Sequence, residues 1–469
     1  MQQYIPSQSE MQIHSKRTAL FFIACLACLA LFAQERPGPA FPLSLSVNGH
    51  HLKDRNGKPF LIREISAWGL IQALSEDDEE SFLDSVKERG FNTVMVSIIS
   101  FDTRFAGNPP NWEGISPFRQ PWDFSTYNPA YFEHADRFLK LAMDKGFLVL
   151  LVPCYLGYKG DVNQGWANKL LMPSNSREKS RSYGQFLGRR YADFPNLIWV
   201  AGGDNRGDGP LYAHLNAIIQ GIKSFDSVHL WTGHFESAQP TNWSTGNPLY
   251  ASYIDLDGLY DFVESDLGAE SPQYRTELKQ YGRGKMIFQL DQSYEHDIPH
   301  VADNEDPAHM RRKNYDGLLS GCAGTSFSPG LPGNPCYTFI DWKPLMNTEG
   351  MREMKYCFEF FESLRWYDLV PLTGDRLIRT GRGAWATVDY VCAAMDLDRS
   401  MLVAYLPTAR TLQIDLARLR GKSVTATWID PQTGKRQKAG SFRTQGRVNL
   451  APPASGDWVL LIEKAPDPS

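Results

Sequence analysis

The sequence lacks several features that would place it in common protein classes. Its 469 residues carry 48 Lys and Arg against 53 Asp and Glu, so it has no basic excess of the kind that nucleic-acid binding requires. Two of its seven cysteines, Cys25 and Cys28, lie inside an apolar N-terminal run, and the other five have no regular spacing. This pattern fits neither a disulfide framework nor a zinc site, and it leaves open whether Cys322 and Cys336 are bridged.

Familiar catalytic motifs are also missing. No Gly-rich phosphate loop follows an expected strand, which argues against a nucleotide-binding sheet. HExxH, Walker and GxSxG motifs do not occur where their context would support them. Asp255 and Asp257 lack the remainder of a calcium-binding loop. We therefore expect neither a metal nor a cofactor.

One long apolar run occurs, near the N-terminus, and none like it follows. Lys16 and Arg17 precede the run Thr18–Ala33, which is short for a membrane span and typical of a signal peptide. The sequence predicts a signal peptide over residues 1–33, a secreted or periplasmic bacterial protein and no membrane span in the mature chain. An uncleaved anchor is the alternative. Residues 34–43 are rich in Pro and Gly and are expected to form a linker.

Residues 44–370 alternate short β-like runs with helical patterns. Several runs are continuously apolar, as expected for strands that are buried on both faces. The alternation predicts an α/β fold, a (β/α)8 TIM barrel, although counting alone also allows an open doubly wound sheet. The expected strands are Pro59–Glu64, Asn92–Ile98, Phe147–Val152, Leu197–Gly202, Val228–Thr232, Leu259–Glu264, Met286–Leu290 and Cys322–Phe327. The expected helices are Ser75–Gly90, Ala130–Lys145, Arg177–Tyr191, Leu211–Phe225 and Pro307–Leu319.

The pattern changes after about Pro371, where β-like runs dominate. Asp430–Gly434 is a turn sequence between two of them. These features predict a small C-terminal β-sandwich over residues 371–469. The expected strands are Ala384–Asp389, Val391–Met395, Met401–Tyr405, Thr411–Asp415, Ser423–Trp428 and Trp458–Ile462.

Two acids occupy the strand ends where barrel active sites form. Asp204 follows the fourth strand after Gly202 and Gly203, and Asp291 directly follows the seventh. Because strand ends meet at one mouth, we expect both carboxylates to face one bound ring. Glycosidic bond hydrolysis commonly uses such a pair: one carboxyl protonates the leaving oxygen, and the other attacks or activates water. The alternative is structural, with Asp204 capping a helix and Asp291 in a salt bridge.

The stretch Asn196–Asp204 resembles the signature of the apiosidase-like glycoside hydrolases. Residues 42–465 carry further agreement in matching order. The C-terminal part resembles a domain that is usually appended to that barrel and often labelled collagen-binding. The agreeing stretches are Ser66–Trp68, Gly90–Asn92, His234, Tyr294–Glu295, Arg312, Tyr315, Gly321, Gly324, Tyr405–Thr408 and Trp428–Gly434.

The resemblance implies a retaining, exo-acting glycoside hydrolase that removes terminal sugars from plant-type or other complex glycans, with an apiose-like linkage as one option. Asp204 would be the acid/base and Asp291 the nucleophile. Three residues depart from the family pattern, since Asp291 replaces Glu, Ile65 replaces an acid and Asn205 replaces Arg. The shorter Asp allows a compensating backbone shift, an inverting mechanism or lost activity. The alternatives are a catalytically impaired glycan-binding barrel and an adhesion protein acting through its C-terminal domain.

Six further residues are expected to contact an oligosaccharide or polysaccharide substrate: Trp68, His234, Tyr294, Glu295, Asn205 and Trp122. Tyr294 has the spacing to hydrogen-bond Asp291, and Glu295 could position a loop or replace the nucleophile. Trp122 lies in a long loop, residues 101–127, which is expected to form a wall or lid. For each residue, ordinary packing is the structural alternative.

Overall fold

The computed structural model describes residues 38–465 except 100–109, 159–163, 238–241, 262–272, 297–305, 332–333, 336–338, 340 and 375. The predicted signal peptide, the start of the predicted linker and residue Cys336 lie outside this part of the chain. Within it, no helix has the length and apolar character needed to cross a membrane.

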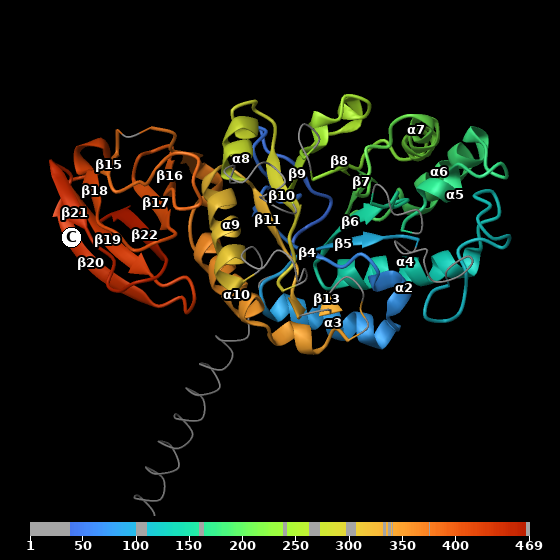
Figure 1. The fold of residues 1–469 in the computed structure, drawn as a ribbon, viewed down its shortest axis with the longest axis horizontal. Coiled ribbons are helices and arrows are strands. Elements are labelled where there is room, and N and C mark those ends of the chain that lie inside the picture. The colour runs from blue at the N-terminus through green and yellow to red at the C-terminus, as the bar shows by residue number, and fades with distance from the viewer. Residues whose placement is uncertain are drawn as a thin grey trace, which may run out of the picture. The chain divides into compact units, whose positions relative to one another are not determined.

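Eight parallel strands follow one another in chain order and are surrounded by helices (Figure 1), which confirms the predicted barrel class. Six are hydrogen-bonded in the order β11-β4-β5-β6-β7-β8, and β9 pairs with β10. Backbone hydrogen bonds span the two gaps: Asp255 N and Leu256 N donate to Trp231 O at 2.9 and 3.1 Å, and Ala323 N donates to Ile287 O at 2.8 Å. The strands are β4 (Ile62–Ser66), β5 (Thr93–Ser97), β6 (Leu148–Val152), β7 (Leu197–Gly202), β8 (Trp231–His234), β9 (Asp257–Asp261), β10 (Ile287–Gln292) and β11 (Gly324–Phe327).

Burial explains why these segments form strands. Every residue of β5, β6 and β7 is buried, so their apolar runs face the barrel interior on one side and the helices on the other. Each predicted barrel strand occurs, with ends that differ from the predicted ones by at most three residues. β8 begins at Trp231 rather than at Val228, and β4 begins at Ile62 rather than at Pro59, a shift of three residues in both cases.

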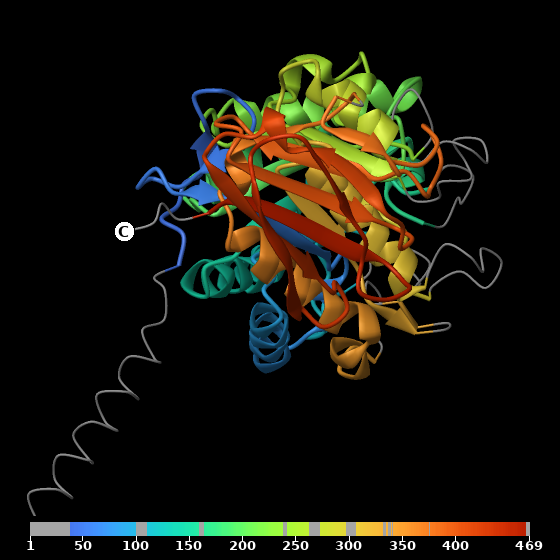
Figure 2. The ribbon, with the colours of Figure 1, turned by 90° about the vertical axis from the view of Figure 1, so that its left-hand side faces the viewer.

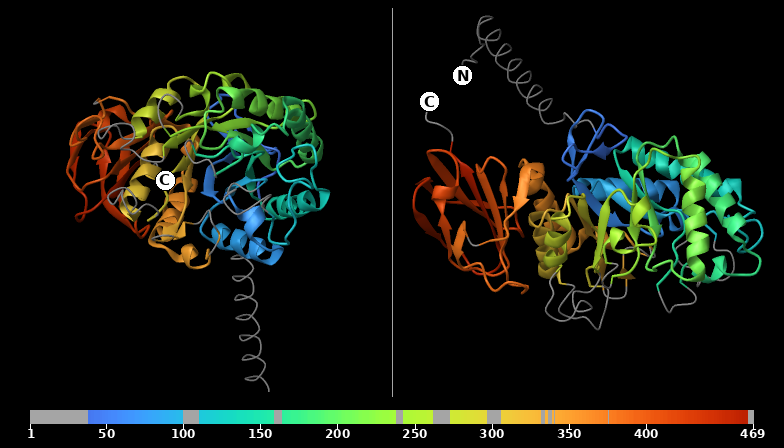
Figure 3. Two further views of the ribbon diagram at one scale, coloured as in Figure 1. Left: turned by 45° about the vertical axis from the view of Figure 1, so that its right-hand side comes forward. Right: turned by 90° about the horizontal axis from the view of Figure 1, so that it is seen from above.

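Helices cover the outside of the strands (Figure 3). Five lie where the sequence predicts them, and Ser75 caps the first of these by accepting a hydrogen bond from Asp78 N at 3.2 Å. The two four-residue helices α2 and α5, the shorter α8 and the long α10 were not predicted. The helices are α2 (Leu70–Ala73), α3 (Glu76–Glu88), α4 (Pro129–Asp144), α5 (Ala167–Leu170), α6 (Arg177–Tyr191), α7 (Pro210–Lys223), α8 (Tyr274–Tyr281), α9 (Pro307–Leu319) and α10 (Glu349–Glu362).

Short strands add two small pieces to the barrel. β1 (Ser44–Leu45), β2 (Leu52–Lys53) and β3 (Pro59–Phe60) form an antiparallel sheet before the first barrel strand, and β12 (Gly330–Leu331) pairs with β13 (Asn334–Pro335). Phe41, which belongs to the predicted linker, is buried and packs near Phe60.

The C-terminal strands form two antiparallel sheets around a separate apolar core (Figure 2). Along β19, buried and half-buried residues alternate, as expected when one face of a strand covers the core. The six-stranded sheet has the order β14-β16-β17-β22-β19-β20, and the other has the order β15-β18-β21. The strands are β14 (Leu369–Pro371), β15 (Ile378–Thr380), β16 (Cys392–Asp396), β17 (Met401–Leu406), β18 (Leu412–Asp415), β19 (Ser423–Ile429), β20 (Arg436–Arg443), β21 (Arg447–Leu450) and β22 (Trp458–Lys464).

One strand prediction in this region is wrong. Ala384–Asp389 is a turn, and Ala386 has a φ of 67°. The Tyr274 hydroxyl accepts a hydrogen bond from Ala386 N at 2.9 Å and donates to Thr387 O at 3.2 Å. These two bonds fix the segment against α8 of the barrel and draw its backbone away from a sheet ladder.

The barrel and the sandwich share a buried polar contact. Arg311 on α9 donates two hydrogen bonds to Asp457, at 2.7 and 3.0 Å, and one to Glu353. The Tyr315 ring on α9 stacks on Tyr405 of β17, with ring centroids 4.9 Å apart. The bidentate pair and the stacked rings fix α9 against the sandwich.

Candidate active site

Asp204 stands on a sharp turn after β7. Gly202, Gly203 and Asp204 have φ values of 94°, 105° and 52°, all in the left-handed region. A Cβ at Gly202 would collide with the backbone of His234, and one at Gly203 would collide with the Tyr155 ring. The two glycines therefore let the chain pass close to β8 and turn the acid toward the barrel mouth.

The two oxygens of the Asp204 carboxylate have different surroundings. Oδ2 accepts a hydrogen bond from the Tyr155 hydroxyl. Oδ1 lies 3.6 Å from His234 Nδ1 and has no hydrogen-bond partner among the described residues. The side chain is 17% exposed, whereas Oδ1 itself is buried, so Asp204 is fixed through Oδ2 and is only partly open to solvent.

Asp291, within β10, is enclosed by hydrogen-bond donors. Oδ1 accepts from Ser66 Oγ at 3.1 Å and from Gln292 N at 3.0 Å, and Oδ2 accepts from His234 Nε2 at 3.0 Å and from the Tyr294 hydroxyl at 3.2 Å. The side chain is 2% exposed. Burial raises the pKa of Asp291, against the opposing effect of His234.

His234 lies between the two acids. Asp204 N donates to His234 Nδ1 at 3.2 Å, so the neutral ring carries its proton on Nε2, which faces Asp291. Burial acts to lower the pKa of His234, but the charges of Asp204 and Asp291 outweigh it and the pKa is raised. The Tyr260 ring of β9 stacks on the imidazole, with centroids 4.0 Å apart. One imidazole therefore binds the Asp291 carboxylate through Nε2 and the backbone N–H of Asp204 through Nδ1.

Trp68, which follows β4, completes this group. Its Nε1 donates to the Tyr294 hydroxyl at 3.2 Å, and that hydroxyl donates to Asp291. Its ring lies edge-on to Tyr155 and to His234, with centroids 5.1 Å away in both cases. The structure thus brings together five residues that the sequence singled out, namely Asp204, Asp291, Trp68, His234 and Tyr294.

The remaining predicted residues have other contacts. Glu295 Oε1 accepts a hydrogen bond from Gly350 N at 2.8 Å, in the first turn of α10, which makes this acid a helix cap. Asn205 donates to Gly157 O at 3.3 Å and accepts from Gly207 N at 3.0 Å, so it holds the turn that follows Asp204.

Trp122 lies in an aromatic cluster, with its ring 5.6 Å from Trp166 and a cation–π contact to Lys169 at 4.7 Å. Tyr127 from the same loop stacks on Phe186 of α6. The end of the predicted lid loop is therefore packed against helices, and residues 101–109 of the loop lie outside the described part of the chain.

Sequence reasoning missed four side chains of this site. Tyr155, Tyr260, Ser66 and Glu64 contact the acids, directly or through one another. Ser66 Oγ lies 3.2 Å from Glu64 Oε1, and Glu64 is 0% exposed. Burial and the nearby charge of Asp291 raise the pKa of Glu64 well above its usual value. An acid in an apolar strand, two residues before Ser66 and hence on the same face, was the available signal.

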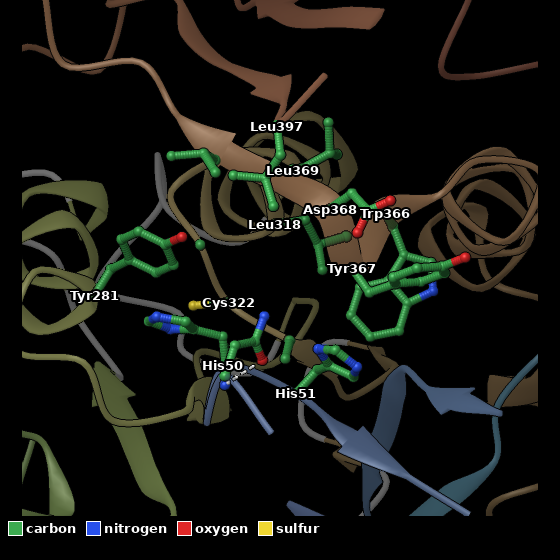
Figure 4. Close-up of a pocket in the computed structure, with 14 residues that line it drawn as sticks. His50, His51, Tyr281, Leu318, Cys322, Trp366, Tyr367, Asp368, Leu369 and Leu397 are labelled. Atoms are coloured by element: carbon green, nitrogen blue, oxygen red, sulfur yellow. Dashed lines mark hydrogen bonds between the residues drawn. The ribbon is translucent and has the colours of Figure 1, made fainter. Parts of the chain in front are cut away.

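A cavity of about 240 Å³ lies at the other end of the barrel, beside the start of β11 (Figure 4). His50, His51 and Cys322 line it, and none of the predicted site residues does. Cys322 is a free thiol, and Cys336, with which it could pair, lies outside the described residues. Among the described residues, no group of three or more His, Cys, Asp and Glu is arranged to hold a metal ion.

Comparisons with known proteins match both parts of the chain. Residues 46–368 match the model of the apiosidase-like catalytic domain, and residues 377–463 match the "Putative collagen-binding domain of a collagenase". A solved structure described as a glycoside hydrolase is 22% identical, with a TM-score of 0.74 over 91% of this chain and 99% of its own. A glycoside hydrolase family 5 structure from Bacteroides vulgatus is also 22% identical, with a TM-score of 0.74 over 90% and 93%. Comparison with curated proteins found no match. Since the first family model covers more than half of the sequence, the chain belongs to the apiosidase-like glycoside hydrolases.

Proposed function

We propose that this chain hydrolyses terminal glycosidic bonds in plant-type or other complex glycans by a retaining mechanism, with Asp204 as the acid/base and Asp291 as the nucleophile. The observation that carries the proposal is that one imidazole, His234, contacts both carboxylates, at 3.6 Å and 3.0 Å. Two acids from strands far apart in the sequence therefore lie close enough to act on one bond.

The surroundings of the two acids support different roles. An acid/base must exchange a proton with the leaving oxygen and then with water, and Asp204 is the more exposed acid, at 17% against 2% for Asp291. A nucleophile must be an anion, and the four donors around Asp291 favour the ionised form.

In the proposed reaction, Asp204 protonates the leaving oxygen while an Asp291 oxygen bonds to the anomeric carbon and the glycosidic bond breaks. Asp204 then takes a proton from water, which displaces Asp291 and releases the sugar. The exo mode of action and the secreted or periplasmic location belong to this proposal. They rest on the resemblance and on the apolar N-terminal run.

A glycan-binding protein without hydrolysis is the second candidate, and the depth of Asp291 favours it. The side chain is 2% exposed and one methylene shorter than the Glu that the family usually carries. If the anomeric carbon cannot approach Asp291, the pocket would hold a glycan without cleaving it.

A release assay on mixed pectic and hemicellulosic oligosaccharides separates the two candidates. Wild type should release sugar, whereas Asp204→Asn and Asp291→Asn should lose on the order of a hundredfold or more in rate with unchanged thermal unfolding. Asp257→Asn is a matched control, because Asp257 is a buried aspartate at the start of β9 that bonds Thr245. Binding without released sugar in wild type would support the second candidate, and full release by Asp204→Asn would refute the first.

Stereochemistry is tested separately. Proton NMR of the product at early times should show retention of the anomeric configuration. A crystal structure should then show the two carboxyl groups about 5–5.5 Å apart, whereas about 6.5–9.5 Å together with an inverted product would contradict the retaining part of the proposal.

A further inference from the structure

Glu64 lies inside the barrel directly behind the proposed nucleophile. It is on β4, is 0% exposed, and its Oε1 is 3.2 Å from Ser66 Oγ. The same Ser66 oxygen is 3.1 Å from Asp291 Oδ1. One hydroxyl thus connects two buried carboxyl groups, and neither the family match nor the sequence assigns a role to the inner one.

The Ser66 hydroxyl, which lies between Glu64 and Asp291, can donate only one hydrogen bond. If both carboxyl groups were ionised, Ser66 could donate to one, and the other would face a lone pair in a site without solvent, which is costly. If Glu64 is protonated, it donates to Ser66 Oγ, and Ser66 donates to Asp291. Both hydroxyl protons of this chain then have an acceptor.

The surroundings decide which acid keeps the proton. Asp291 accepts four hydrogen bonds, including one from His234 Nε2 on β8. The groups facing Glu64 are Ser66 on its own strand, the Met95 backbone on β5, Ser326 on β11 and the acid of Asp291 on β10. No cation is among them, so the proton belongs on Glu64.

The acids of the site are also arranged in order of depth. Asp204 faces Asp291 from the end of β7, through His234, and Tyr260 on β9 covers the imidazole. Burial is the larger cause that raises the pKa of Glu64, and the charge of Asp291 raises it further. Both effects favour a neutral Glu64. Burial also raises the pKa of Asp291, but the hydrogen bonds from His234 and Ser66 oppose this rise.

We propose that Glu64 is a positioning residue, a neutral carboxyl group that acts through Ser66 to orient and support the Asp291 carboxylate for reaction. It touches no substrate. This inference rests on the proposed function of Asp291, but the protonation of Glu64 can be tested without a substrate.

The kinetic test compares Glu64→Gln, Glu64→Leu and Ser66→Ala in the release assay on mixed pectic and hemicellulosic oligosaccharides. Glu64→Leu and Ser66→Ala should lower kcat about ten- to hundredfold with little change in KM, because each breaks the chain of hydrogen bonds to a charged group. Glu64→Gln should rescue most of the loss, because its amide N–H can still donate to Ser66.

The pH profile separates a neutral Glu64 from a charged one. For a neutral Glu64, the acid limb of kcat/KM in Glu64→Gln coincides with that of wild type, whereas Ser66→Ala moves it upward because the Asp291 anion loses a donor. If Glu64 acts as a charge, Glu64→Gln removes a neighbouring anion and moves the acid limb downward, by more than about half a pH unit. That downward shift would overturn the proposal.

Infrared difference spectroscopy at neutral pH needs no activity. Wild type minus Glu64→Gln should contain the C=O stretch of a protonated carboxylic acid, and the same band should persist in Glu295→Gln, a control at a buried glutamate that caps α10. An ionised carboxylate signal instead would refute the inference, even in a protein that releases sugar. A protonated signal in a protein that releases none would leave Glu64 neutral and place the failure in the proposed hydrolysis.

Discussion

Lengthening Asp291 to the Glu that the family usually carries should impair this protein. One added C–C bond of about 1.5 Å moves the carboxylate by roughly 1 Å, into the space held by His234 and Tyr294. A displacement of 1 Å costs on the order of a hundredfold in rate. The extra methylene in a closed site should lower the free energy of unfolding by about 1–3 kcal/mol. We expect Asp291→Glu to lose activity rather than gain it.

The assay is kcat/KM for sugar release, measured beside urea unfolding of the same preparations. Asp291→Asn serves as a same-size reference that lacks the charge. An Asp291→Glu variant as active as wild type would show that the four donors do not fix the carboxylate. The reasoning from the enclosed geometry of Asp291 would then be wrong.

Three further substitutions test other parts of the structure. Gly203→Ala should cost about a hundredfold in sugar release, since its Cβ would collide with the Tyr155 ring at a φ of 105°, and an unchanged rate would contradict the close approach. Glu295→Gln should lower the free energy of unfolding by about 1 kcal/mol, because glutamine caps α10 more weakly, and should leave sugar release unchanged. Lost sugar release with normal stability would instead point to a role of Glu295 in catalysis. Burial acts to raise the pKa of Asp457, but Arg311 outweighs it, and the pKa is lowered. The ionised acid therefore stabilises the folded protein at pH values above its unfolded pKa, near 3.9. This stabilisation is lost as the pH falls through the lowered pKa of the folded protein. The difference in melting temperature between wild type and Asp457→Asn should therefore be largest near neutral pH and shrink below about pH 4, and a constant difference would contradict this assignment.

Local patterns predicted most of the fold. Continuous apolar runs such as Leu148–Val152 identify strands buried on both faces, and Ser75 before a run of acids marks a helix start. Placement after strand ends was enough to bring Asp204 and Asp291 to one site, since parallel strands end at one mouth.

Long-range contacts set what the sequence could not predict. Ala384–Asp389 has β-like composition, but hydrogen bonds to Tyr274, more than a hundred residues away in sequence, make it a turn. Glu295 stands one residue after Tyr294 and was expected beside the substrate, yet its oxygen caps a helix that was itself not predicted. The role of Glu64 depends on a hydroxyl shared with another strand, and spacing within one strand does not reveal such sharing.

The central claim is that Asp204 and Asp291 act on the same bond, and the double variant Asp204→Asn/Asp291→Asn tests it most directly. Groups that act as one unit are strongly non-additive, so kcat/KM of the double variant should fall no lower than that of the more impaired single variant. Losses that multiply would show two independent contributions. Such a result, or normal release by the double variant, would contradict a shared reaction at this pair of carboxylates.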